Sequence, residues 1–217
     1  MSLRINDVVP DFTAQTDQGE IRFHEWIGDN WAILFSHPKD FTPICTTEFG
    51  ATAQMAGDWA KYNTKVIGIS VDGVEEHKGW KTDIEKVAGC KADFPIIADE
   101  DLKIAKAFDM LPADAYLPDG RTPADSATVR NVFIIGPDKK LKLIMVYPMN
   151  VGRNFNEVLR ALIALQTAAG EGVSIPVNWN PGDSVVIPGT LSDEDAKRKY
   201  GEVETVLPYL RKVKLPG

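Results

Sequence analysis

The stretch Thr42-Pro43-Ile44-Cys45 combines a thiol with residues that are typical of a helix start. It follows the apolar run 31–35, which has the composition of a buried strand. Proline suits the first helical position, because its missing N–H group would have no partner there, so Thr42 is the expected N-cap and Cys45 the third helical residue. Unpaired N–H groups and the positive end of the helix dipole stabilise a thiolate there. The sequence therefore predicts a reactive cysteine.

The elements that must position this thiol alternate between β-branched runs and helical segments. We predict strands over 31–36, 65–71, 94–98, 129–136 and 140–147, and helices over 43–61, 75–88, 101–108 and 154–168. Such alternation is typical of an α/β domain built around a mixed sheet. After Gly170 the sequence becomes rich in Pro and Gly and ends with a charged segment over 192–200. We therefore predict a domain over 1–168 and an extension over 171–217 that wraps on a partner.

Composition excludes several classes of protein. The chain has 217 residues, a formal net charge of −7 and two cysteines, Cys45 and Cys90. It holds no apolar run of the ~20 residues that a membrane span requires, and no basic block that would suit nucleic acid. Two cysteines are too few for a disulfide framework, and the start over 1–7 lacks the apolar core of a signal peptide. We therefore expect a cytoplasmic protein that binds small molecules or proteins.

The residues around the thiol match a longer pattern. Pro38, Thr42 and Cys45 fill the spacing PxxxTxxC, which resembles the active-site motif of peroxiredoxins. The His-Pro at 37–38, the strand that carries Arg130, the helix start over 152–155 and the long extension are similar to the 1-Cys subfamily. This resemblance implies a thioredoxin-like α/β fold, with a mixed sheet flanked by helices and a C-terminal extension that joins a homodimer.

The resemblance also implies a reaction. Cys45 would be the peroxidatic thiol, which reduces hydrogen peroxide and organic hydroperoxides and becomes a sulfenic acid. Cys90 lies in no motif of a resolving cysteine and is expected to be a small buried residue. An external thiol of the glutathione or thioredoxin type is therefore the expected reductant. No cofactor and no metal is expected, because His24, His37 and His77 fit no zinc spacing.

Five side chains are assigned to the site around Cys45 by the same resemblance. Thr42 and Arg130 would hydrogen-bond the thiolate and the peroxide, and Pro38 would shield the pocket. Glu48 and Arg153 would hold Arg130 in place. The residue types alone leave other readings open, since Thr42 is also a helix cap and an arginine on a strand edge is ordinarily a paired surface residue.

His37 has two readings that the sequence does not separate. A histidine that ends a buried strand could carry a proton for the thiol chemistry, or it could be a structural group with satisfied hydrogen bonds. Ionisation alone does not explain catalysis, because a thiol of pKa ~8.5 is already about 3% ionised at pH 7 and full ionisation gains only about 30-fold. Hydrogen-bond donors at the peroxide must therefore provide most of the acceleration.

Two other functions remain to be weighed. A redox sensor or holdase would use oxidation of Cys45 as a signal rather than for turnover. Mammalian members of the subfamily also resemble phospholipases, through a serine with an upstream His and a distant Asp. Here His24 and Asp138 are present, but Asn30 stands in the place of the serine and offers no hydroxyl nucleophile. Lipase activity is therefore not expected.

Overall fold

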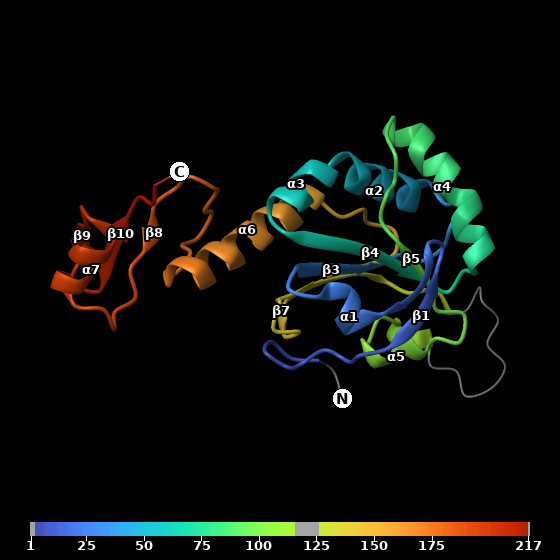
Figure 1. Ribbon diagram of the computed structural model, residues 1–217, viewed down its shortest axis with the longest axis horizontal. Coiled ribbons are helices and arrows are strands. Elements are labelled where there is room, and N and C mark those ends of the chain that lie inside the picture. Colours follow the sequence, from blue (N-terminus) through green and yellow to red (C-terminus); the bar gives the residue numbers. More distant parts are fainter. Residues whose placement is uncertain (1–2, 116–125, 217) are drawn as a thin grey trace. The chain divides into compact units, whose positions relative to one another are not determined.

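The computed structural model describes residues 3–115 and 126–216 and divides into two compact units, Met1–Phe155 and Asn156–Gly217 (Figure 1). This division lies before the predicted boundary between 168 and 171, because residues of the last long helix pack against the extension. Ile163 and Ala164 contact the cluster formed by Val173, Trp179 and other buried residues of the second unit. The domain limits given above remain a prediction.

A seven-stranded mixed sheet forms the centre of the first unit. Its strands are β1 Thr13–Thr16, β2 Gly19–Arg22, β3 Trp31–Ser36, β4 Thr64–Ser70, β5 Ile96–Ala98, β6 Arg130–Ile135 and β7 Leu141–Tyr147. They follow the order β2-β1-β5-β4-β3-β6-β7. β3 runs parallel to β4 and antiparallel to β6. The sheet is therefore mixed, as the sequence predicted.

The hairpin of β1 and β2 is absent from the prediction. Its buried positions are occupied by Ala14 and Thr16, which are small or polar, so the strands lack an apolar alternation that could be read from the sequence.

Helices cover both faces of this sheet (Figure 1). On one face lie α2 Pro43–Gln54, α3 Ala56–Lys61 and α4 Val74–Ala88, and on the other lie α1 Phe23–Ile27 and α5 Lys103–Ala107. A short 3-10 turn, η1, spans Ala113–Ala115.

The prediction of one helix over 43–61 is wrong, because the helix breaks at Met55, where φ is −90° and ψ is 12°. The break lets Trp59 turn inward, where it is 4% exposed and donates its Nε1–H to the carbonyl oxygen of Thr52.

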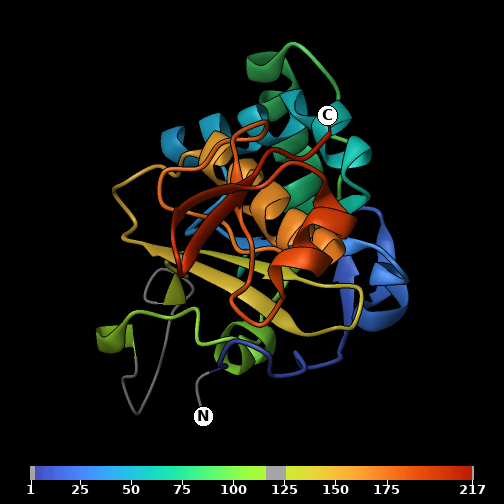
Figure 2. The same cartoon turned by 90° about the vertical axis from the view of Figure 1, so that its left-hand side faces the viewer.

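The second unit has its own small core. It contains α6 Phe155–Glu171, which begins at the unit boundary, α7 Asp193–Tyr200, and a sheet of order β8-β10-β9 with β8 Val185–Val186, β9 Glu204–Leu207 and β10 Leu210–Val213. Figure 2 shows the β9–β10 hairpin in dark red. Ser192 caps α7 by accepting the N–H of Asp195. Among the described helices of both units, none is long and apolar enough to cross a membrane.

The packing of α2 on the sheet yields a first prediction. A Cβ atom added at Gly68 in β4 would lie 2.7 Å from the ring of Phe49 in α2, which is fully buried. Because neither backbone nor ring can move freely there, Gly68→Ala should lower the free energy of unfolding by about 1–3 kcal/mol. Urea denaturation measures this change.

The control for this prediction is Gly57→Ala. Gly57 lies in α3 with no atom within 4 Å of an added Cβ. Alanine restricts the unfolded chain and favours the helix, so this variant should gain about 0.4–1 kcal/mol. Equal stability of both variants would contradict the close contact of β4 with Phe49.

Candidate active site

The thiol lies where the chain leaves β3 and enters α2. Thr42 has the extended conformation of an N-cap, with φ −113° and ψ 147°, and Pro43 is the first helical residue. Phe41 before it has a φ of 55°, which turns the loop into the helix. Cys45 therefore stands in the first turn of α2, as predicted, and its side chain is fully buried.

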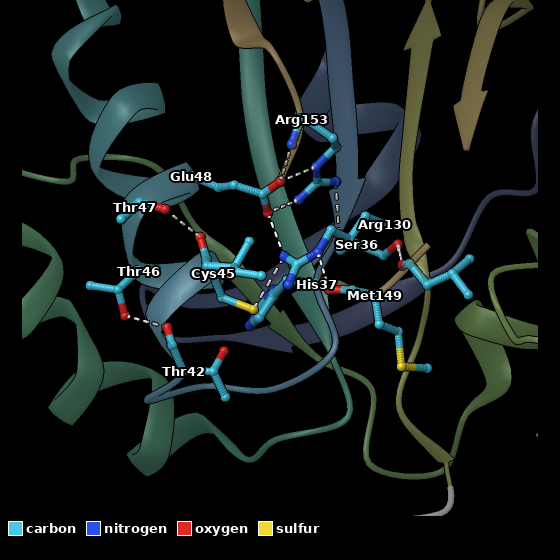
Figure 3. A network of polar contacts seen from close by, with 12 residues as sticks. Ser36, His37, Thr42, Cys45, Thr46, Thr47, Glu48, Arg130, Met149 and Arg153 are labelled. Atoms are coloured by element: carbon cyan, nitrogen blue, oxygen red, sulfur yellow. Dashed lines mark hydrogen bonds and ion pairs between the residues drawn. The ribbon is translucent and has the colours of Figure 1, made fainter. Parts of the chain in front are cut away.

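A guanidinium group lies against the sulfur (Figure 3). Arg130, the first residue of β6, is 3% exposed, and its Nη1 lies 3.4 Å from Sγ of Cys45. The same Nη1 lies 2.7 Å from Oε2 of Glu48, and Nε donates to the carbonyl oxygen of Met149 over 2.8 Å. A positive charge held at this distance stabilises negative charge on the sulfur.

Glu48 is held by a second arginine. Its Oε1 accepts the backbone N–H of Arg153 at 2.7 Å and Nε at 2.9 Å, while Oε2 accepts Nη2 at 2.6 Å. Nη1 of Arg153 donates to the carbonyl oxygens of Ser36 and Asn131. Burial alone would raise the pKa of Glu48, but Arg153, and then Arg130, hold that pKa below its usual value. Two guanidinium groups share one carboxylate, so the site has a net positive charge.

Two predicted residues, Thr42 and Pro38, occupy the loop before α2 as expected. The Thr42 hydroxyl donates to the carbonyl oxygen of Lys39 at 2.9 Å and makes no hydrogen bond with a backbone N–H of the helix, so it is an N-cap by position only. Pro38 is half-buried between His37, which is buried, and Lys39, which is exposed. Their roles toward peroxide remain predictions.

His37 belongs to a buried polar group that sequence reasoning missed. Its Nε2 lies 2.6 Å from Oδ1 of Asp40, and Nδ1 of His77 lies 2.6 Å from Oδ2 of the same carboxylate. Both rings are fully buried. The spacing of His37 and Asp40 in one loop could have indicated the first pair. Nothing in the sequence links either residue to His77, which lies 37 positions after Asp40 on α4.

Among the described residues, one group of side chains lies close enough together to hold a metal ion. One set, His37, Asp40 and Asp72, has ligand atoms within 4.8 Å of one another. Within this set, Oδ2 of Asp72 accepts the N–H of Asp40 and the hydroxyl of Ser70.

Known proteins share this chain's sequence over nearly its whole length. Residues 5–144 match the AhpC/TSA family, and residues 164–202 match the C-terminal domain of 1-Cys peroxiredoxin. The chain belongs to the 1-Cys peroxiredoxins. As a member of this family it is an enzyme, a thiol-dependent peroxidase.

Individual peroxiredoxins agree with this assignment in sequence and in structure. A mitochondrial peroxiredoxin of Saccharomyces cerevisiae is 47% identical over 96% of this chain and 80% of its own, and human peroxiredoxin-6 is 47% identical over 91% and 88%. A structure of the yeast mitochondrial 1-Cys peroxiredoxin has a TM-score of 0.89 at 46% identity, covering 98% of this chain and 99% of its own. A cysteine-to-serine mutant of the peroxiredoxin 6 of Arenicola marina has a TM-score of 0.91 at 41% identity, covering 99% of both. The thioredoxin-like fold is thereby confirmed.

The second cysteine of this peroxiredoxin differs from expectation. Cys90 follows the left-handed Gly89 at the end of α4 and is exposed, so its prediction as a small buried residue is wrong. Gly89, with a φ of 70°, ends the helix, and Cys90 lies beyond it.

The three residues in the places of a lipase triad have separate partners. His24 contacts the carbonyl oxygen of Val9, Asn30 donates to that of Ile27, and Asp138 pairs with Lys142.

The shared carboxylate of Glu48 leads to a second prediction. Glu48→Gln should lower the free energy of unfolding at pH 7 by about 3–5 kcal/mol, because two buried guanidinium groups lose their counter-charge. The pKa of Glu48 is lowered from 4.5 in the folded protein, so its contribution is complete above about pH 4.5 and is lost as the pH falls through the folded value. Urea denaturation from pH 7 to pH 3 should show the two proteins converging.

Glu75→Gln is the matched control. Glu75 pairs with Lys78 on the surface of α4, where its side chain is 81% exposed. Loss of such a pair should change the unfolding free energy by less than about 1 kcal/mol. If Glu48→Gln cost no more than this control, the buried pairing would be structurally unimportant.

Proposed function

We propose that Cys45 is the peroxidatic thiol and that it reduces hydrogen peroxide and organic hydroperoxides. The observation that carries this proposal is the guanidinium nitrogen of Arg130 at 3.4 Å from the sulfur of a first-turn cysteine. The thiolate attacks the terminal oxygen of the peroxide, the O–O bond breaks, and the leaving oxygen takes a proton. Cys45 becomes a sulfenic acid and the peroxide becomes water or an alcohol.

The rate must come chiefly from donors that bind the peroxide more strongly as its O–O bond stretches. Arg130 is suited to this role, because Nε and Nη1 have partners while Nη2 makes no hydrogen bond within the described part of the chain. The N–H of Cys45 at the helix start is a second donor. Thr42 becomes a third when its hydroxyl rotates away from Lys39, and Pro38 limits the access of water.

An external thiol reduces the sulfenic acid in this proposal. Gln54 donates to the carbonyl oxygen of Ala88, so the end of α4 lies beside the end of α2, and Cys90 lies two residues further on. At 1.5 Å per residue, Gln54 is about 13 Å along the helix from Cys45. A disulfide needs Cα atoms within about 7 Å, so Cys90 is not placed to resolve Cys45. The yeast structure concerns thiol resolution through glutathione and thioredoxin systems, which supports a reductant of either type.

Turnover distinguishes this proposal from a redox sensor. With excess glutathione or a thioredoxin system, we expect continued peroxide consumption by the wild type and by Cys90→Ser, and none by Cys45→Ser, because among the described residues only Cys45 has an arginine at its sulfur. A sensor would stop after about one equivalent of peroxide. Coupled peroxide assays, with mass spectrometry of both cysteines, measure this. Retained activity in Cys45→Ser would refute the assignment.

We further propose a homodimer, to which the extension 171–217 contributes. The observed support is exposed apolar surface. Val146 is 61% exposed on β7, a strand paired only with β6 among the described strands. In the second unit, Val206 and Tyr209 are 45% and 79% exposed on the β9–β10 hairpin. Unpaired strand edges with apolar side chains are typical of association surfaces.

Light scattering after size-exclusion chromatography tests these surfaces. Val146→Lys and Tyr209→Lys should each shift the protein toward the monomer, because a charge would be buried in the interface. Val87→Lys is the control, since Val87 is similarly exposed, at 57%, but lies on a helix. A monomeric wild type would contradict the dimer, and unchanged dimers in both variants would contradict these two surfaces.

We also propose the cytoplasm as the site of action, because the free thiols Cys45 and Cys90 suit a reducing compartment. The yeast relative is mitochondrial. Fluorescence imaging of the tagged full-length protein tests this proposal.

A further inference from the structure

The first unit contains a cavity of about 330 Å³ where two strands of the sheet begin. Thr64, the first residue of β4, and Pro95, directly before β5, are among its lining residues. β3, β4 and β5 run parallel, and Cys45 follows the C-terminal end of β3. The cavity and the thiol therefore lie at opposite ends of these strands. Its volume falls in the range of small-molecule sites, about 300–1,000 Å³.

Aromatic side chains form much of the lining. Trp26 of α1 is half-buried, and Trp59 of α3 and Phe94 before β5 are buried. The indole Nε1–H of Trp59 donates to the carbonyl oxygen of Thr52, so the polar atom of this ring is already satisfied. Apolar lining residues from α2, α3 and the link between them are small, which leaves the space unfilled: Ala53, Ala56 and Ala60. Such walls suit a planar aromatic group, which gains apolar burial and ring contacts.

Two charged side chains of the lining have no counter-charge. Lys65 is half-buried, and its ammonium group donates to the carbonyl oxygen of Trp26 and lies 5.4 Å from the centroid of the Trp26 ring. An ammonium group has three donors, so others remain. Neither Lys65 nor Asp93 forms an ion pair with a described residue, whereas the neighbouring Lys81 and Asp17 pair with each other. Within the described part of the chain, the cavity thus offers an uncompensated cation and an uncompensated anion.

These two charges approach the cavity from adjacent segments. Gly68 in β4 is the register partner of Ile96 in β5, and Lys65 and Asp93 each lie three residues earlier in the chain. Both line the same small space, so one small ligand can contact both. The exposed amide of Gln18, from the turn between β1 and β2, also belongs to the lining.

We propose that this cavity binds a free aromatic amino acid. The ring packs against Trp26 and Trp59, the α-carboxylate accepts from the ammonium group of Lys65, and the α-ammonium group donates to the carboxylate of Asp93. Charge-assisted hydrogen bonds of this kind are stronger than neutral ones. An apolar ligand would leave both protein charges unpaired, and a ligand with a single charge would leave one of them unpaired. The binding is separate from the chemistry of Cys45.

L-Tryptophan and two analogues test the two charges on the unaltered protein. Indole-3-propionate lacks the ammonium group, and tryptamine lacks the carboxylate. ¹H–¹⁵N NMR of the labelled protein observes the indole N–H groups of its five tryptophans, which Trp26→Phe and Trp59→Phe assign. We expect saturable shifts of these two signals, with a dissociation constant on the order of 1 mM for L-tryptophan and about tenfold weaker binding of each analogue.

Two variants assign the charges to their residues. Lys65→Met keeps the apolar stem and should weaken L-tryptophan and indole-3-propionate about tenfold, leaving tryptamine unchanged. Asp93→Asn should weaken L-tryptophan and tryptamine by a similar factor and leave indole-3-propionate unchanged. Both residues are remote from the thiol, so unchanged peroxide turnover shows that each variant is folded.

Lys61→Met and Asp58→Asn are the matched controls. Lys61 also lies over an aromatic ring, that of Tyr62 at 5.3 Å, and Asp58 is exposed on α3, but neither lines the cavity. Both variants should bind all three ligands as the wild type does. Loss of the ligand preferences in these controls would overturn the assignment to Lys65 and Asp93.

The ligand comparison also decides the proposal without any charge variant. Equal affinity for the three ligands would overturn it, as would the absence of saturation at ten times the expected dissociation constant. Trp80 is an internal reference, because its indole N–H donates to Thr46 near the start of α2. Shifts of Trp80 as large as those of Trp26 would contradict binding in this cavity. Peroxide turnover without tryptophan binding would overturn this inference alone, and the proposed role of Cys45 would stand.

Discussion

The geometry of the thiol site depends on one buried carboxylate, that of Glu48. An unpaired charge in the interior would cost several kcal/mol, so Glu48 requires the two guanidinium groups that surround it. Those groups come from different places in the sequence, Arg130 at the start of β6 and Arg153 in the segment before α6. A single carboxylate therefore joins α2 to β6 and, through the contact of Arg153 with Ser36, to the end of β3. The position of Arg130 at the sulfur follows from this charge pairing.

Two buried carboxylates in the first unit have partners of different chemistry. Around Glu48 two cations meet one anion, and guanidinium groups do not lose their protons at physiological pH. That network provides a constant positive potential at Cys45. Around Asp40 one buried carboxylate instead contacts two imidazole rings, with Oδ1 at 2.6 Å from Nε2 of His37 and Oδ2 at 2.6 Å from Nδ1 of His77.

Sequence patterns account for part of this arrangement. The α/β class followed from alternating strands and helices, and the place of Cys45 followed from Pro43, whose backbone suits the first turn. The thioredoxin-like fold and the role of Arg130 required the resemblance to peroxiredoxins, because a lone arginine on a strand carries no signal of a partner 85 positions away.

Other features could not be predicted, because tertiary contacts decide them. The break at Met55 depends on the burial of Trp59, and the hydrogen bond of Asp40 with His77 joins a loop to a distant helix. Neither the helix break nor this contact follows from the conformational propensities of the local sequence.

Arg130 keeps one donor group free although it pairs with a buried carboxylate. Arg153 makes this possible, because it supplies most of the hydrogen bonds to Glu48. Arg153 uses its donors on both oxygens of Glu48 and on two backbone carbonyl oxygens, so it satisfies most of the acceptors near the site. Arg130 then needs only Nε and Nη1 to hold its position. Its Nη2, without a partner in the described part of the chain, remains available for an oxygen atom that gains charge during the reaction. Since ionisation of a thiol contributes at most about 30-fold, the proposed mechanism depends more on this free donor than on the charge that the guanidinium group carries.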